Sequence, residues 1–149
     1  MIVGVGIDIV DTERWVRSLE RIQDQIFTPR ELAACANRVD RVDALAARFA
    51  AKEACLKALH TGIAAGALRQ IEIVADAGAP TVQLAGALAK RARESGVRRA
   101  HVSLSHEAGC AAAVVILEGT RQRARTPRRR DASWTLETTV SGGGEAATW

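Results

Sequence analysis

The chain has 149 residues, 48% of them hydrophobic and 26% charged, which predicts one globular domain with a modest core. No apolar run reaches the roughly 18 residues that a membrane span needs, and no basic leader precedes Asp8, so we expect neither a membrane segment nor a signal peptide. Cys35, Cys55 and Cys110 lack metal-binding spacing, and we interpret them as buried free thiols in a reducing cytoplasm.

Most of the net charge of +4 lies near the C-terminus. From Gly119 onward six arginines face three acidic residues, whereas residues 1–118 carry a single excess positive charge. The same C-terminal segment has almost no apolar periodicity. We therefore expect a nearly neutral domain over residues 1–118 that binds no nucleic acid, followed by a basic, disordered tail over residues 119–149.

The first ten residues alternate with the two-residue period of a β-strand. One face carries apolar side chains, at Val3, Val5, Ile7 and Ile9. The other face carries Gly4, Gly6 and Asp8. The two glycines leave room beside Asp8, where either a ligand or another segment of backbone can approach closely.

Three helices are expected in the first half of the chain. The first is capped by Asp11 or Thr12. Its apolar face carries Trp15, Leu19, Ile22 and Ile26, and another face carries a basic stripe of Arg14, Arg17 and Arg21. The segment from Thr28 to Glu31 has the form of a capping box and begins a short second helix. A long third helix begins near Asp40 or Asp43 and ends at Thr61-Gly62, where glycine can adopt the left-handed conformation.

The second half alternates between strands and a helix. In order, we expect a hairpin of strands 71–74 and 81–84, a helix over 85–95 that stops at Gly96, a strand over 101–104, a tight turn over 105–109 and a buried strand over 110–117. This mixed order predicts an α+β fold with a small antiparallel sheet.

The long helix carries an acid and a base one turn apart. Glu53 lies at the edge of its apolar stripe, and Lys57 follows at i+4. With Asp8, Glu53 offers the hard oxygen ligands that Mg²⁺ prefers, and Lys57 offers a cation for a phosphate. The alternative is structural: Asp8 caps the next helix, and Glu53 forms an ordinary surface ion pair with Lys57.

Ser105 and His106 are a second candidate site. We expect them at the end of a strand, where both side chains can reach a phosphate, although a histidine at a surface turn is a simpler alternative. The chain contains no G-x-x-x-x-G-K-[ST], G-x-G-x-x-G or G-x-S-x-G segment, which argues against nucleotide-binding loops and hydrolases of those types.

Three segments in order resemble those of one family. They are Gly6-Ile7-Asp8-Ile9-Val10, the helix segment from Arg48 to Ala58, and Val102-Ser103-Leu104-Ser105-His106. Together they resemble holo-acyl-carrier-protein synthase, the short, single-unit type of 4′-phosphopantetheinyl transferase. The resemblance extends over residues 1 to about 118.

The resemblance implies a reaction and roles for the site residues. The serine hydroxyl of an apo acyl carrier protein attacks the β-phosphate of coenzyme A, and adenosine 3′,5′-bisphosphate is released. Asp8 and Glu53 match the family's magnesium ligands, and Lys57 matches its pyrophosphate-binding lysine. The serine proton goes either to Glu53 or to a water near Asp8.

Other positions match residues that contact coenzyme A, and some depart from the family. The implied nucleotide contacts are Arg48, Pro80, Ser105 and His106. Ala79 replaces a basic residue of the family's glycine–basic–proline turn, and His60 stands where the family usually has glycine.

The resemblance also implies partners. Carrier proteins of this kind present an acidic helix, which gives the stripe Arg14, Arg17 and Arg21 a docking partner, although a solvated helix face is the commoner explanation. Family members are typically trimers with sites shared between subunits.

Two alternatives to this enzyme function stay open. One is a weakened homologue that only binds carrier protein or nucleotide, and the other is a nucleic-acid binder that uses the tail.

Overall fold

The computed structural model describes residues 1–62, 67–75 and 78–120. The elements in chain order are β1 (Ile2–Asp11), α1 (Thr12–Ile26), α2 (Pro29–Cys35), α3 (Arg41–Ala58), the 3₁₀ helix η1 (Ala67–Gln70), β2 (Ile71–Val74), β3 (Thr81–Leu84), α4 (Gly86–Glu94), β4 (Val97–Glu107) and β5 (Cys110–Gly119). Both sheets are antiparallel, which confirms the predicted α+β class. The predicted tail lies mostly outside the described residues, so the division of the chain at residue 118 stays a prediction.

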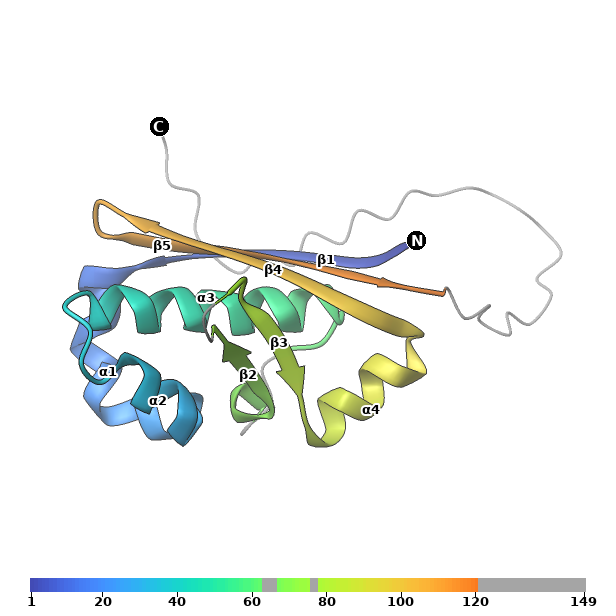
Figure 1. The fold of residues 1–149 in the computed structure, drawn as a ribbon, viewed down its shortest axis with the longest axis horizontal. Helices are drawn as coiled ribbons and strands as arrows, with labels where there is room; N and C mark the ends of the chain where they lie inside the picture. Colours follow the sequence, from blue (N-terminus) through green and yellow to red (C-terminus); the bar gives the residue numbers. More distant parts are fainter. Residues whose placement is uncertain (63–66, 76–77, 121–149) are drawn as a thin grey trace, which may run out of the picture.

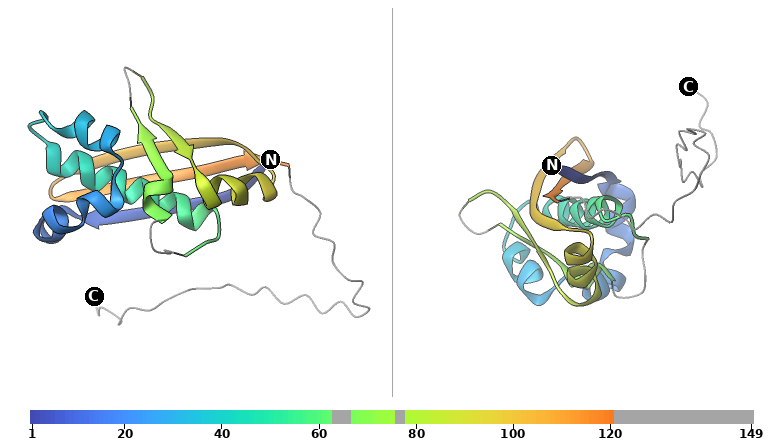
Figure 2. Two further views of the ribbon diagram at one scale, coloured as in Figure 1. Left: turned by 90° about the horizontal axis from the view of Figure 1, so that it is seen from below. Right: turned by 90° about the vertical axis from the view of Figure 1, so that its right-hand side faces the viewer.

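The long helix α3 is the centre of the fold. A three-stranded sheet of order β1-β5-β4 covers one side of it, and α1, α2, the β2–β3 hairpin and α4 lie on the other (Figures 1 and 2). Most of its residues are buried, and many are alanine, including Ala46, Ala50, Ala51 and Ala54. A helix that is apolar nearly all round suits a position between two layers, because small side chains allow close approach on every side.

The glycines of β1 allow its backbone to contact that of α3. A Cβ atom added at Gly4 would overlap the carbonyl oxygen of Ala58, and one at Gly6 would overlap that of Ala54. Of the two predicted reasons for these glycines, the structure supports the close approach of another backbone. Asp8 follows on the same face, so this approach brings Asp8 toward α3.

The apolar face of β1 is consequently the outer one. Val5, Ile7 and Ile9 are 54%, 67% and 70% exposed, although their neighbours on the opposite face are covered by α3. No described element covers this outer face of the sheet (Figure 1). Large β-branched side chains in such numbers on one exposed face are typical of a surface that another protein covers.

The predicted helix starts are confirmed. The side chain of Asp11 caps α1 by accepting a 3.0 Å hydrogen bond from the Arg14 backbone nitrogen. Thr28 and Glu31 form the predicted capping box at α2. Among the described residues, no helix combines the length and the apolar character of a membrane span.

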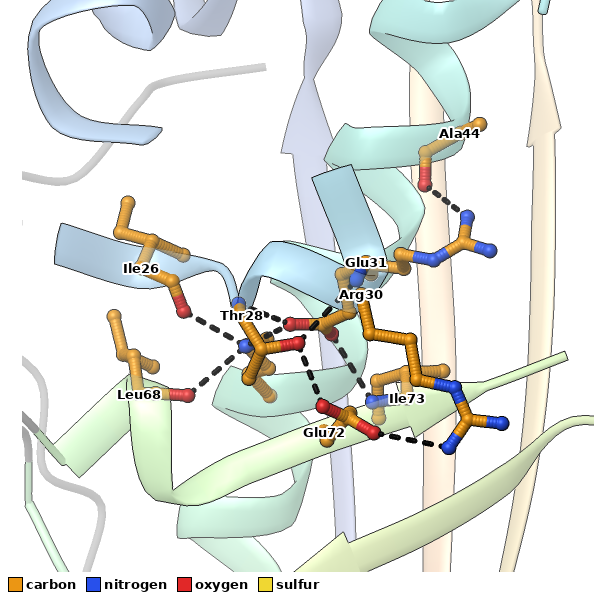
Figure 3. Close-up of polar contacts among 10 residues, drawn as sticks. Ile26, Thr28, Arg30, Glu31, Ala44, Leu68, Glu72 and Ile73 are labelled. Atoms are coloured by element: carbon orange, nitrogen blue, oxygen red, sulfur yellow. Dashed lines mark hydrogen bonds and ion pairs between the residues drawn. The ribbon is translucent and has the colours of Figure 1, made fainter. Parts of the chain in front are cut away.

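A buried ion pair joins several elements beneath α3. The Lys52 ammonium is fully buried, and it donates to Glu31 Oε2 and the Ile26 carbonyl, both at 2.7 Å, and to the Leu68 carbonyl at 3.0 Å. The other carboxylate oxygen of Glu31 accepts from the Ile73 backbone nitrogen (Figure 3). Burial lowers the pKa of Lys52, and Glu31 opposes that shift. The contacts tie α1, α2, η1 and β2 to α3.

Two predicted turns differ from the structure. His60, with φ of 52°, takes the left-handed conformation expected of Gly62, and the backbone nitrogens of His60 and Thr61 close the end of α3. Residues 105–107 belong to β4 instead of a turn. The connection to β5 is the two-residue turn Ala108-Gly109, where both residues have positive φ.

Candidate active site

Asp8, Glu53 and Lys57 come together where β1 crosses α3. Lys57 Nζ donates to Asp8 Oδ1 at 2.8 Å and to the Ile7 carbonyl oxygen at 2.9 Å. The ammonium therefore pairs across to the strand, and the ion pair with Glu53 that the i+4 spacing suggested does not form. The helix supplies Glu53 and Lys57 on successive turns, and the glycine face of β1 supplies Asp8.

Glu53 has an unusual environment for a carboxylate. Its Oε1 atom is buried and accepts no hydrogen bond from any described residue. Burial raises the pKa of Glu53, the nearby Asp8 raises it further, and Lys57 opposes both effects. A desolvated carboxylate oxygen without a donor is well suited to a cation or to a substrate proton.

Asp8 and Glu53 line a cavity of about 710 Å³. Besides the two acids, its wall is formed by the end of β1, by α1, by Cys110 at the start of β5 and by Phe49, one turn before Glu53 on α3. The apolar part consists mainly of Trp15, Ile22, Ile26 and Phe49. The cavity thus combines an acidic region with a much larger apolar one.

Three of the predicted nucleotide-binding residues line a separate cavity of about 180 Å³. They are Arg48, Pro80 and His106. This cavity shares no lining residue with the first, although Arg48 and Glu53 are only five positions apart on α3. His106 lies on β4 and Asp8 on β1, which are the two outer strands of the sheet.

Two charged residues that sequence patterns did not reveal lie at this cavity: Arg38 lines it, and Asp40 contacts the lining residues Arg38 and His106. Asp40 Oδ2 lies 3.6 Å from His106 Nε2 and 2.6 Å from Arg38 Nη2. The hydrogen bond from Arg38 lowers the pKa of Asp40. Arg48 Nη1 donates to the Ala44 carbonyl at 3.0 Å, and its buried Nε has no partner among the described residues. Two arginines and a histidine beside one small cavity suit an anion.

Ser105 is separated from this group. Successive side chains on a strand point to opposite faces, and Ser105 lies with Ile7 and Ser103 in a shallow depression on the other face of the sheet. The structure therefore brings Arg48, Pro80 and His106 together but not Ser105. The predicted docking residues Arg14, Arg17 and Arg21 are all exposed on α1, and Arg14 also lines the larger cavity.

Comparisons with known proteins show the family to which the chain is similar. Residues 4–115 match the family model of the 4′-phosphopantetheinyl transferase superfamily. The holo-[acyl-carrier-protein] synthase of Anaeromyxobacter sp. (strain K) is 45% identical over 129 residues, covering 80% of this chain and 98% of that protein.

Solved structures of the same kind share the fold. The crystal structure of holo-[acyl-carrier-protein] synthase from Neisseria meningitidis is 40% identical, with a TM-score of 0.72, and covers 79% of this chain and 99% of its own. A coenzyme A complex of the Chronobacterium ammoniagenes enzyme is 30% identical, with a TM-score of 0.70 over 79% of this chain and 98% of its own.

Proposed function

The chain belongs to the 4′-phosphopantetheinyl transferase superfamily, as a member of its holo-[acyl-carrier-protein] synthase type, and on that premise we propose its reaction. It transfers 4′-phosphopantetheine from coenzyme A to a serine of an apo acyl carrier protein, with Mg²⁺, in the cytoplasm. The observation that carries the proposal is the grouping of Asp8, Glu53 and Lys57 beside the larger cavity. The buried Glu53 oxygen, which has no partner in the described ranges and suits a cation or a substrate proton, supports this reaction.

The acids of this group fit a magnesium ion. The buried Glu53 Oε1 atom lacks a partner, and Asp8 lies close enough to raise the pKa of Glu53. Within the described ranges, no cluster of three or more acidic, histidine or cysteine side chains could hold a metal, so substrate oxygens and water would complete the coordination. Bound by Asp8 and Glu53, the ion would neutralise pyrophosphate charge.

Lys57 would act on the leaving side of the reaction. The serine oxygen forms a bond to the β-phosphorus of coenzyme A, and the bond from that phosphorus to the bridging oxygen breaks. The bridging oxygen leaves with adenosine 3′,5′-bisphosphate and carries the charge that the Lys57 ammonium stabilises. The serine proton passes to Glu53 or to a water near Asp8.

We further propose that the active site is shared between chains of a trimer. Coenzyme A has to meet both the acid group on the β1 side and the cationic group around Arg48 and His106 on the β4 side. These groups line separate cavities of one chain, at opposite edges of one sheet. Two neighbouring chains can supply one group each, and the exposed apolar face of β1 offers a surface for their contact.

The carrier protein would dock on α1. Arg14, Arg17 and Arg21 are exposed on this helix, and Arg14 lies at the wall of the larger cavity, near the acids. An acidic helix would be steered to this stripe by complementary charge. Reversing the charge at Arg14 and Arg17 should raise the KM for carrier protein at low salt, and an unchanged KM would contradict docking there.

The decisive experiment mixes the full chain with apo carrier protein, coenzyme A and Mg²⁺ and measures the intact mass of the carrier protein. Transfer appears as the added phosphopantetheine. Lys57→Ala should retain metal binding and lower transfer on the order of 10²–10³-fold, whereas Glu53→Ala should weaken both. Several carrier proteins should be tried. If none of them gains mass but the chain still binds one of them, the chain is a binding module instead.

A further inference from the structure

A residue in the apolar wall of the larger cavity carries a buried hydrogen-bond donor without a partner in the described part of the chain. Trp15 is 8% exposed, it lines the cavity, and its indole Nε1 has no acceptor among the described residues. A desolvated N–H without an acceptor destabilises the protein unless a ligand supplies the missing partner. This donor belongs to neither the acid group nor the basic stripe.

Aromatic contacts restrict the indole ring. The Trp15 ring meets the Phe27 ring edge-on, with centroids 6.0 Å apart, and lies at 33° to the Phe49 ring, with centroids 5.8 Å apart. Both contacts involve residues whose positions are set by the core: Phe27 is almost fully buried, and Phe49 is on α3. The N–H direction is therefore largely fixed before a ligand binds.

The order of residues along α3 gives the cavity a direction. Phe49, Glu53 and Lys57 follow at intervals of four, so they form one row along the helix. Resting on the proposed function, the pyrophosphate of coenzyme A lies by Glu53 and Lys57. Since Lys57 takes the leaving, adenosine-bearing side, the pantetheine side extends toward Phe49. The apolar part of the cavity begins there.

We propose that the part of the cavity around Trp15 binds the pantetheine arm, and that Trp15 Nε1–H donates a hydrogen bond to one of its amide carbonyl oxygens. The arm alternates short aliphatic segments with amides, which matches apolar walls that carry one fixed donor. Ile22, Ile26 and Phe49 contact the aliphatic segments. Trp15 is thus a substrate-binding residue that distinguishes coenzyme A from nucleotides without the arm.

Calorimetry with two ligands tests this assignment. Trp15→Phe keeps an aromatic ring at the position and removes the donor. With the full chain and Mg²⁺, the variant should bind coenzyme A roughly three- to tenfold more weakly than the wild type, the effect of one hydrogen bond. Binding of adenosine 3′,5′-bisphosphate, which lacks the arm, should stay within about twofold. Val16→Ala changes an exposed residue of the same helix that does not line the cavity, so it is the control and should leave both affinities unchanged.

Three outcomes would overturn the assignment. They are equal weakening of both ligands, unchanged coenzyme A affinity, and a change confined to the carrier-protein KM, which would place a carrier-protein side chain in the cavity. Failure of the wild type to bind coenzyme A or to transfer its arm would instead contradict the proposed function.

A second measurement keeps Trp15 in place and does not depend on how Trp15→Phe folds. The chain has three tryptophans, and replacing Trp134 and Trp149 by phenylalanine leaves Trp15 as the sole tryptophan fluorophore. Coenzyme A should change its emission, and adenosine 3′,5′-bisphosphate should not. Equal responses to both ligands would contradict contact between Trp15 and the arm.

Discussion

His60 adopts a backbone conformation that glycine reaches with less strain. Its φ of 52° is required because the nitrogens of His60 and Thr61 bond back to the carbonyls of Lys57 and Leu56. Arg91 Nη2 donates to the His60 carbonyl at 2.9 Å, which fixes the same backbone from outside. The departure from the family's glycine therefore lies at the C-terminal cap of α3, one turn beyond Lys57.

Replacing this residue by glycine should stabilise the protein. His60→Gly removes the Cβ contact of the left-handed conformation, which costs roughly 1–2 kcal/mol, while the unfolded chain gains entropy. We expect a net increase of about 0.5–1 kcal/mol in the free energy of unfolding, measured by urea denaturation. His60→Ala is the control, since it retains Cβ, and a similar gain there would contradict the explanation.

At this same scale the sequence predicted that Asp8, Glu53 and Lys57 form one group, but not how these side chains pair. The i+4 spacing on one helix identifies Glu53 and Lys57 as neighbours, and the open glycine face of the first strand adds Asp8, as the motif resemblance also implies. Spacing cannot show that β1 approaches α3 closely enough for Lys57 to bond Asp8 instead. The indole N–H of Trp15, which has no described acceptor, was not predicted either, because a tryptophan on the apolar face of a helix predicts only a core residue.

Among the elements, the contact between β1 and α3 has the least tolerance for change. Gly6→Ala would force a methyl group into the Ala54 carbonyl, one residue from Glu53, and a backbone carbonyl cannot move aside without shifting the helix. We expect a loss of about 3 kcal/mol in stability together with loss of transfer. Thermal and urea denaturation measure the first, and carrier-protein mass the second.

A matched glycine provides the control for this change. Gly62 has no atom within 4 Å of an added Cβ and lies outside the left-handed region. Gly62→Ala should therefore alter stability by no more than about 0.5 kcal/mol. Equal effects at the two positions would show that close packing of β1 on α3 is not the reason for Gly6.

The buried ion pair below α3 makes a separate prediction. Lys52→Met leaves the Glu31 carboxylate buried without its counter-ion, which should cost about 3–5 kcal/mol in urea denaturation. The double variant Lys52→Met/Glu31→Gln removes both charges. It should be less destabilised than the sum of the two single variants, and strict additivity would contradict direct coupling between the two side chains.

Elements without an apolar pattern were the hardest to predict. The sequence pattern shows β4 as a strand over residues 101–104, where apolar side chains alternate. Ser105, His106 and Glu107 extend it through backbone pairing with Ala112, Ala111 and Cys110, while their own side chains stay exposed. Backbone pairing of this kind produces no alternation of apolar residues in the sequence, so these three polar residues were predicted as a turn. The capping box at Thr28, in contrast, involves only local contacts and was predicted correctly.

For the whole molecule, the exposed apolar face of the sheet leads to a prediction about assembly. The proposed trimer requires that Val5, Ile7 and Ile9 be covered by neighbouring chains. Ile7→Lys should give a monomer by light scattering with a folded circular dichroism spectrum, because Ile7 contributes little to the core of one chain. Transfer should be lost together with assembly, because the acidic cavity of one chain would no longer lie beside the cationic cavity of its neighbour.

The control for assembly is an exposed apolar residue on another element. Val16 on α1 is 40% exposed, and Val16→Lys should leave the molecular mass unchanged. If Ile7→Lys keeps the mass of the wild type, the apolar face is not the contact surface. Sequence periodicity separated the two faces of β1 correctly, but it could not show that the glycine face is the inner one.

If the proposed function holds, the bond between Lys57 and Asp8 couples the binding of the cation to the binding of the nucleotide. In the free protein the Lys57 ammonium already neutralises the Asp8 carboxylate. A divalent cation that binds Asp8 therefore competes with Lys57. A pyrophosphate that attracts Lys57 releases Asp8 from this competition. Each ligand is therefore expected to raise the affinity for the other by the same factor, and the cation and the nucleotide bind cooperatively.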